Sequence, residues 1–215
     1  SRSIQSNHHD GPASFTSDGK KIYYARPNDI RNTAAALNDP KNYAGIYEAE
    51  WDGESWVNIK KLPFSDSAHV FTHPAISPNG DFIVFASNLK TGKGNSDLYI
   101  SRKKGNTWSE PESLGNNFNS KSNDFFPFIH FNGDLYFSSN KKGDFDIYRC
   151  KVNGQSWDKP IPLAEPINSS YDDYSIYIEK NGLDGYFSSN RDGAFDLYHF
   201  KKPESEEWEC DSLIE

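Results

Sequence analysis

Short apolar runs separated by polar turns make up most of the chain. The runs at residues 21–25, 82–86 and 135–137 each follow an Asp-Gly or Asn-Gly pair. Such a pair between two apolar runs favours a tight hairpin, and successive side chains on a strand point to opposite faces. A third run then ends in tyrosine and is followed by a short turn and a tryptophan. The pattern therefore predicts units of antiparallel strands.

These units repeat along the chain. Residues 137–148 read Phe-Ser-Ser-Asn-Lys-Lys-Gly-Asp-Phe-Asp-Ile-Tyr, residues 187–198 repeat them almost letter for letter, and residues 85–99 hold a looser copy. Four short strands in a unit of about 50 residues are typical of a β-propeller blade. Each blade needs its neighbours to cover its apolar faces. The repeat therefore predicts one domain rather than two.

The predicted fold is all-β, a β-propeller built of four-stranded antiparallel blades. It spans residues 1–203, and residues 204–215 are predicted to form a C-terminal outer strand or a linker to a following domain. Four blades are legible, and we expect them to belong to a larger ring of about six in preference to a closed ring of four. The units lie at about residues 8–64, 69–119, 123–170 and 171–210.

Charge and composition exclude several classes of function. The net charge is -8 and the basic residues are scattered, whereas nucleic-acid binding needs a concentrated basic face, so no nucleic-acid partner is expected. No apolar run approaches the length of a membrane span. Cys150 and Cys210 lack C-x-x-C spacing. Free thiols are favoured for both, and a bridge between them stays open.

Five stretches of the aligned units carry a resemblance to a known family, residues 9–19, 73–80, 126–129, 168–173 and 185–191. On these residues the chain resembles the TolB-type, WD-repeat-like propellers of OmpA-family proteins of Bacteroidota. The resemblance covers essentially the whole chain and implies a lipoprotein of the periplasm, associated with the outer membrane and linked to type IX secretion. It also implies partners among proteins of the envelope or secretion machinery, and peptidoglycan bound through a flanking domain that is not in this chain.

The sequence shows no catalytic motif such as G-x-S-x-G or H-E-x-x-H. Together with the resemblance, this predicts a non-catalytic interaction or scaffold module that is not an enzyme and holds no cofactor or metal. An alternative stays open, a carbohydrate-binding or carbohydrate-active propeller with its site at the mouth of the central channel.

A propeller collects one loop from every blade at the channel mouth, so that mouth is the predicted surface for a partner or ligand. The insertion at residues 26–45 offers a second such surface. Histidines near the mouth invite a metal hypothesis, but their spacing matches no metal motif. The candidate mouth residues are His9, Asp10, His73, Asn123, Asp124 and Asp172.

Two further sets of residues recur once per unit, and we predict structural roles for both. Strict recurrence favours packing between blades for the tryptophans rather than sugar stacking. The aspartates are predicted to cap turns, because a calcium loop gathers several oxygen ligands within one short segment. The sets are Trp56, Trp108 and Trp157, and Asp97, Asp146 and Asp196.

Overall fold

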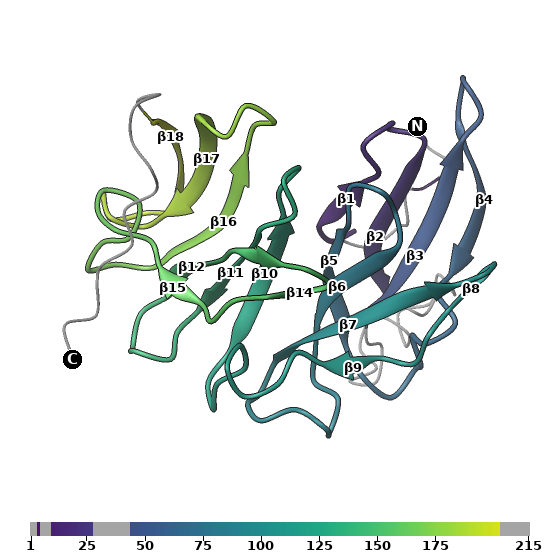
Figure 1. Ribbon diagram of the computed structural model, residues 1–215, viewed down its shortest axis with the longest axis horizontal. Coiled ribbons are helices and arrows are strands. Elements are labelled where there is room, and N and C mark those ends of the chain that lie inside the picture. Colours follow the sequence, from purple (N-terminus) through teal and green to yellow (C-terminus); the bar gives the residue numbers. More distant parts are fainter. Residues whose placement is uncertain (1–3, 5–9, 28–43, 203–215) are drawn as a thin grey trace, which may run out of the picture.

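The computed structural model describes residue 4, residues 10–27 and residues 44–202, and these form strands, turns and loops without a helix. Four antiparallel sheets stand side by side along an arc (Figure 1). The predicted all-β propeller of four legible blades is therefore confirmed. No helix with the length and apolarity needed to cross a membrane occurs in the described part of the chain.

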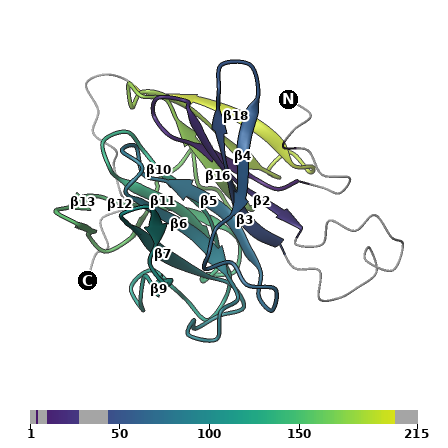
Figure 2. The same ribbon diagram turned by 90° about the vertical axis from the view of Figure 1, so that its right-hand side faces the viewer.

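Each sheet is one blade, and its strands follow one another in sequence order from the innermost strand outward. Blade one shows the arrangement fully, with a long hairpin between its third and fourth strands (Figure 2). Its strands are β1 (Ala13–Phe15), β2 (Lys21–Pro27), β3 (Ala44–Trp51) and β4 (Trp56–Lys61). The predicted insertion lies mostly in residues 28–43, which are outside the described residues.

Blades two and three add a short ribbon beyond the third strand. Blade two consists of β5 (Phe71–Ile76), β6 (Phe82–Ser87), β7 (Asp97–Lys104) and β9 (Glu112–Ser113), with β8 (Thr107–Trp108) folding back on β7. Blade three consists of β10 (Asp124–Ile129), β11 (Leu135–Ser139), β12 (Asp146–Cys150) and β15 (Ile161–Pro162), with β13 (Val152–Asn153) and β14 (Ser156–Trp157) as its ribbon.

Blade four shows three strands in the described part of the chain. They are β16 (Asp173–Ile178), β17 (Asp184–Ser189) and β18 (Asp196–Lys201). The predicted outer strand or linker at residues 204–215 lies outside the described residues, as do Trp208 and Cys210. Cys150 is a buried free thiol, and burial raises its pKa.

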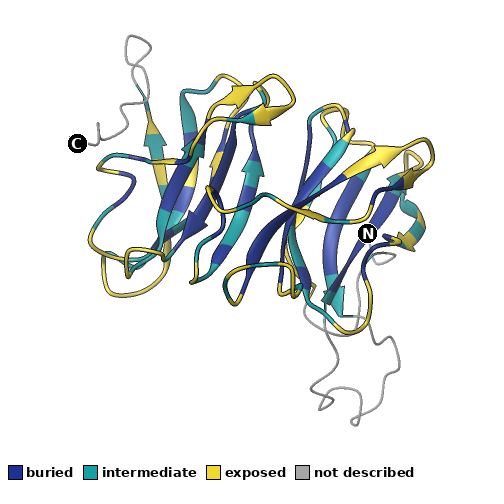
Figure 3. Cartoon of the chain, turned by 60° about the horizontal axis from the view of Figure 1, so that its bottom comes forward, coloured by how far each residue is buried: buried dark blue, intermediate teal, exposed yellow. Residues whose placement is uncertain are grey.

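The core lies between the blades. The innermost strands β1, β5, β10 and β16 contact one another in turn. One apolar cluster joins blades one and two, a second joins blades two and three, and a third joins blades three and four. Figure 3 shows the buried residues in the middle of the strands and the exposed ones mainly at turns and ribbons. The blades are therefore held together chiefly by burial of apolar surface.

The outer face of blade four shows what a missing neighbour does. Tyr136 and Ile147 of blade three are 1% and 0% exposed under blade four. The residues at the same positions in blade four, Tyr186 and Leu197, are 39% and 65% exposed. The repeat thus supplies apolar side chains for an interface that blade four does not complete among the described residues.

Two buried asparagines fasten the connection from one blade to the next. Asn168 accepts a hydrogen bond from the backbone N–H of Ile147 (2.8 Å) and donates to the carbonyls of Ile147 (3.0 Å) and Leu163 (2.8 Å). Asn119 forms the same pair of bonds with Leu98 at 2.8 and 3.0 Å. Each amide thereby satisfies backbone groups of the third strand that would otherwise be buried without partners.

We expect Asn168→Ala to lower the free energy of unfolding by about 1–3 kcal/mol, because it leaves a buried donor and buried acceptors unpaired. Urea denaturation monitored by tryptophan fluorescence measures the change. The matched control is Asn153→Ala, since Asn153 is exposed and, among the described residues, its side-chain amide bonds only the exposed Asp158. Equal stability of Asn168→Ala and the unmodified chain would contradict a stabilising role for these hydrogen bonds.

Candidate functional site

The innermost strands of blades two, three and four share an irregularity near the start of each strand. Their register with the second strand shifts there, and His73, Phe126 and Ser175 adopt positive φ angles of 49°, 51° and 60°. Such angles are unfavourable for residues other than glycine. Their recurrence at one point of three blades shows that the fold requires this bend, and the bend redirects side chains at the channel wall.

Aromatic rings from three blades meet at these bends. The His73 ring lies edge-on to Phe126 at 4.2 Å, and Phe126 stacks on Tyr174 at 4.9 Å. Tyr174 in turn lies 5.1 Å from Phe195, which is 56% exposed. We call His73, Phe126, Tyr174 and Phe195 the aromatic row. It begins in the channel wall of blade two and ends on an exposed ring of blade four.

Three of the predicted mouth residues lie beside this row or at the matching end of blade one. Asp10 is exposed. The backbone N–H of Asn123 bonds the side-chain oxygen of Asn140 at 2.9 Å, and Asp172 bonds that of Asn190 in the same way and at the same distance. These contacts tie the start of each inner strand to the end of its second strand. His9 lies outside the described residues.

Asp124 does not lie on the mouth surface, contrary to the expectation. It is fully buried, and its carboxylate accepts bonds from the Ser120 N–H (2.7 Å) and hydroxyl (3.1 Å). Neighbouring residues on a strand point to opposite faces, so the half-exposed Asn123 places Asp124 inside. Burial raises the pKa of the Asp124 carboxyl. Its equivalent, Asp173, accepts the same two bonds from Ser169 and is also paired with Arg191 at 2.7 Å.

His73 is the titratable member of the aromatic row. Desolvation lowers the pKa of its imidazole to about 4, so the ring is neutral at pH 7. Its Nδ1 is buried and has no hydrogen-bond partner among the residues that the structure describes. In the described part of the chain, no three histidine, cysteine, aspartate or glutamate side chains gather as a metal site would require. His73 therefore acts here as an apolar ring in the wall.

The recurring tryptophans occupy related places. Trp108 lies edge-on to Tyr23 of blade one at 5.8 Å, and Trp157 lies edge-on to Phe82 of blade two at 5.6 Å. Each therefore reaches the blade before its own. Trp56, in blade one, packs against its own blade, 6.0 Å from Phe15.

The recurring aspartates differ from one another. Asp97 accepts bonds from the backbone N–H groups of Lys93 and Gly94, both at 2.9 Å. Asp196 accepts one from the N–H of Leu197 at 2.9 Å, and Asp146 accepts one from the Tyr148 hydroxyl at 3.5 Å. Of the three, Asp97 therefore best matches the predicted turn cap, because it accepts two bonds from backbone N–H groups of the preceding loop.

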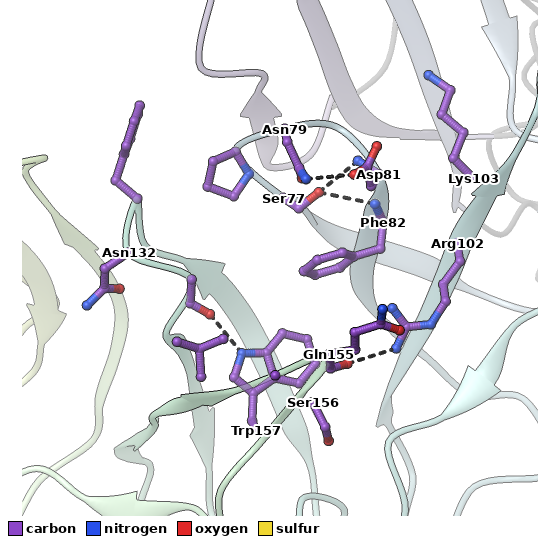
Figure 4. Close-up of a pocket in the computed structure, with 15 residues that line it drawn as sticks. Ser77, Asn79, Asp81, Phe82, Arg102, Lys103, Asn132, Gln155, Ser156 and Trp157 are labelled. Atoms are coloured by element: carbon purple, nitrogen blue, oxygen red, sulfur yellow. Dashed lines mark hydrogen bonds between the residues drawn. The ribbon is translucent and has the colours of Figure 1, made fainter.

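A cavity lies at the other end of the inner strands, between blades two and three, where the sequence analysis predicted no site. It has a volume of about 580 Å³. Figure 4 shows Phe82 and Trp157 facing each other, with Arg102 and Gln155 beside them. We call this space the inter-blade groove, and its characteristic lining residues are Asn79, Phe82, Arg102, Asn132, Gln155 and Trp157.

A second pocket, of about 340 Å³, adjoins the groove. It lies where the far ends of the four inner strands come together, and it is lined from every blade, for example by Phe15, Ile76, Ile129 and Tyr177. Pro78 and Phe131 line both spaces. The groove therefore leads from the channel outward between two blades.

Comparison with solved structures identifies proteins that share this fold. No protein-family model matches the chain. No curated protein matches it either. Among solved structures, TolB from Acinetobacter baumannii is 15% identical with a TM-score of 0.63, and the alignment covers 92% of this chain and 42% of that one. The chain has the fold of a TolB-type propeller. It spans less than half of the TolB chain.

Two enzymes share this fold. One is a prolyl endopeptidase, 13% identical, with a TM-score of 0.55 and coverage of 91% of this chain and 26% of that one. The other is a puromycin-hydrolyzing peptidase of Mycobacterium tuberculosis, 14% identical, with a TM-score of 0.55 and coverage of 90% and 30%. The prediction that the chain is not an enzyme, made from its lack of catalytic motifs and its family resemblance, is therefore wrong, because peptidases contain propellers of this fold.

The neutral His73 makes stability depend on pH. The pKa of about 4 in the folded chain lies below the ordinary 6.5, so the unfolded chain takes up a proton first as pH falls. Stability is therefore lost between about pH 6.5 and pH 4. We expect His73→Asn, which tolerates positive φ, to reduce the loss between pH 7 and pH 4.5 by on the order of 2 kcal/mol.

Urea denaturation of both proteins at the two pH values checks this, because the carboxylates titrate alike in each. Identical pH dependence of the two proteins would contradict the buried, neutral imidazole.

Proposed function

We propose that the chain is the protein-binding propeller of a larger periplasmic protein associated with the outer membrane. The proposal takes that protein to be an OmpA-family lipoprotein of Bacteroidota similar to PorE of the type IX secretion system. Its partners are other proteins of the envelope or secretion machinery, and it is anchored to peptidoglycan through a flanking domain. The likeness to TolB supports the propeller, and the sequence motifs support the rest.

The aromatic row is the observation that carries the proposal. A ring exposed at Phe195 continues into the channel wall through Tyr174 and Phe126, so the mouth offers a fixed apolar surface. Exposed aromatic rings on a rigid scaffold are the usual anchors of protein interfaces. Asp10 and Asp172 supply polar atoms in the same region of the inner strands.

The proposal also includes a ring of about six blades in the parent protein. The exposed Tyr186 and Leu197 support it, because the same positions in blade three are buried by the next blade. Trp108 gives the carbohydrate alternative no support, since it is buried against Tyr23 and offers no face to a sugar.

We expect Phe195→Ser to reduce capture of envelope proteins strongly, because it removes the exposed end of the aromatic row. Quantitative mass spectrometry of pull-downs from envelope extracts of the source organism measures this. The matched control is Ile161→Ser, since Ile161 is also an exposed apolar residue, at 37%, but lies on the outer strand β15 of blade three, apart from the aromatic row and from both pockets. Unchanged capture by Phe195→Ser would sink the proposal for this surface.

A further inference from the structure

One cross-strand pair breaks a pattern of the repeat. Where the second strand of a blade begins, blade one pairs Lys21 with Glu50, and the two form a salt bridge of 2.8 Å. At the same step of blade four, Asp184 pairs with Lys201. Blade two instead pairs Phe82 with Arg102. In blade two the Phe82 ring thus stands where a charged residue would have neutralised Arg102 on the neighbouring strand.

This exchange leaves the Arg102 guanidinium available. It lies 5.7 Å from the centre of the Phe82 ring, and its Nη2 donates a long bond of 3.4 Å to the Gln155 carbonyl. Among the residues that the structure describes, no carboxylate lies within 4 Å of it. An arginine fork without a carboxylate is suited to accept one from another molecule, because its planar donors match both carboxylate oxygens.

The apolar wall beside Arg102 is fixed in place. Trp157 donates its indole N–H to the Gly133 carbonyl at 2.8 Å, and its ring meets Phe82 at 5.6 Å with an interplanar angle of 74°. Both rings are only partly buried, so the chain itself leaves part of their surface open. A side chain entering the groove would bury apolar area against two rings already held in position, which lowers the entropic cost of binding.

The rim of the groove carries polar groups of both kinds. The Gln155 side chain is exposed, and its amide offers N–H donors and a carbonyl acceptor. The other two rim amides already form bonds within the chain, since Asn79 donates to Asp81 at 2.6 Å and the Asn132 oxygen accepts the Asp134 N–H at 2.9 Å.

Arg102 is the cation that lies beside the two rings of the groove. Lys103 also lines the groove, but its ammonium lies 5.7 Å from the Trp108 ring. Asp81 is the one carboxylate among the described lining residues, and it is bonded to Asn79 rather than to Arg102.

We propose that the inter-blade groove binds an acidic segment of a partner protein. A carboxylate of that segment bonds Arg102, and a neighbouring aromatic or large aliphatic side chain packs between Phe82 and Trp157. The exposed Gln155 amide bonds the backbone of the segment, whose N–H and C=O groups need both donors and acceptors. This inference rests on the proposed function as a protein-binding propeller, but it uses a surface separate from the aromatic row.

An extended peptide suits the groove better than a compact anion. Pro78 and Phe131 line both the groove and the second pocket, so an extended segment finds lining surface in two adjoining spaces. A lone phosphate or carboxylate would satisfy Arg102 but leave the apolar wall unused. A segment with an acidic residue next to an apolar one uses both.

The test measures retention of two eight-residue peptide libraries on the immobilised full chain. One library has a fixed central Glu-Phe and the other a fixed central Gln-Phe, with random flanks in both. We expect several-fold greater retention of the Glu-Phe library. Arg102→Gln should reduce that retention roughly tenfold, the effect of losing a hydrogen-bonded charge pair. Lys201→Gln, at the equivalent position of blade four, should leave it unchanged.

Three results of the retention experiment would overturn the proposal. They are equal retention of both libraries, no retention of either, and a loss in Lys201→Gln as large as in Arg102→Gln. Competition with glucuronate oligosaccharides and with inorganic phosphate identifies a glycan or phosphate site, and displacement by either at lower concentration than by Glu-Phe peptides also overturns it. Envelope capture that depends on Phe195 without any library retention would refute the groove alone and leave the proposed function standing.

Discussion

The packing of each sheet against the next is the constraint on which the whole structure depends. Blade three, for example, is apolar on both faces. Phe137 belongs to the cluster shared with blade two, and Tyr136 belongs to the cluster shared with blade four. Such a sheet cannot be stable alone in water. The sheets must therefore lie at a spacing and angle that bury both faces of each. The hydrogen bonds of Asn119 and Asn168 hold the connections between blades in place and so help to keep that arrangement.

Much of this fold could be predicted because its signals are local. A turn dipeptide and a short apolar run specify a hairpin within a few residues, and four copies of the same order specify blades. It was harder to predict which face of a strand a given side chain occupies. Asn123 and Asp124 are adjacent and both polar, yet only register decides that the first is half-exposed and the second buried. The positive φ of His73 and Phe126 likewise depends on the neighbouring strand rather than on either residue alone.

The inter-blade groove could not be found from recurrence alone. It unites Phe82 at the start of β6 with Trp157 in the ribbon of the next blade, and no local pattern connects these segments. A usable signal does exist in the sequence once the units are aligned by register. The position of Phe82 is held by Lys21 in blade one and Asp184 in blade four, so a phenylalanine there departs from a charged pattern. The departure becomes meaningful only when the residue across the strand is known to be Arg102.

The recurring tryptophans show that a residue found in every unit can still take part in a distinct surface. A residue present in every unit, such as the tryptophan, has a packing role wherever a neighbouring blade meets it. Trp108 meets Tyr23 and is buried, whereas Trp157 meets Phe82 and remains partly open. The same scaffold residue thus becomes the wall of a cavity where its partner differs. Recurrence therefore identifies what holds the propeller together, but it does not exclude a binding role, because one unique neighbour is enough to create a distinct surface.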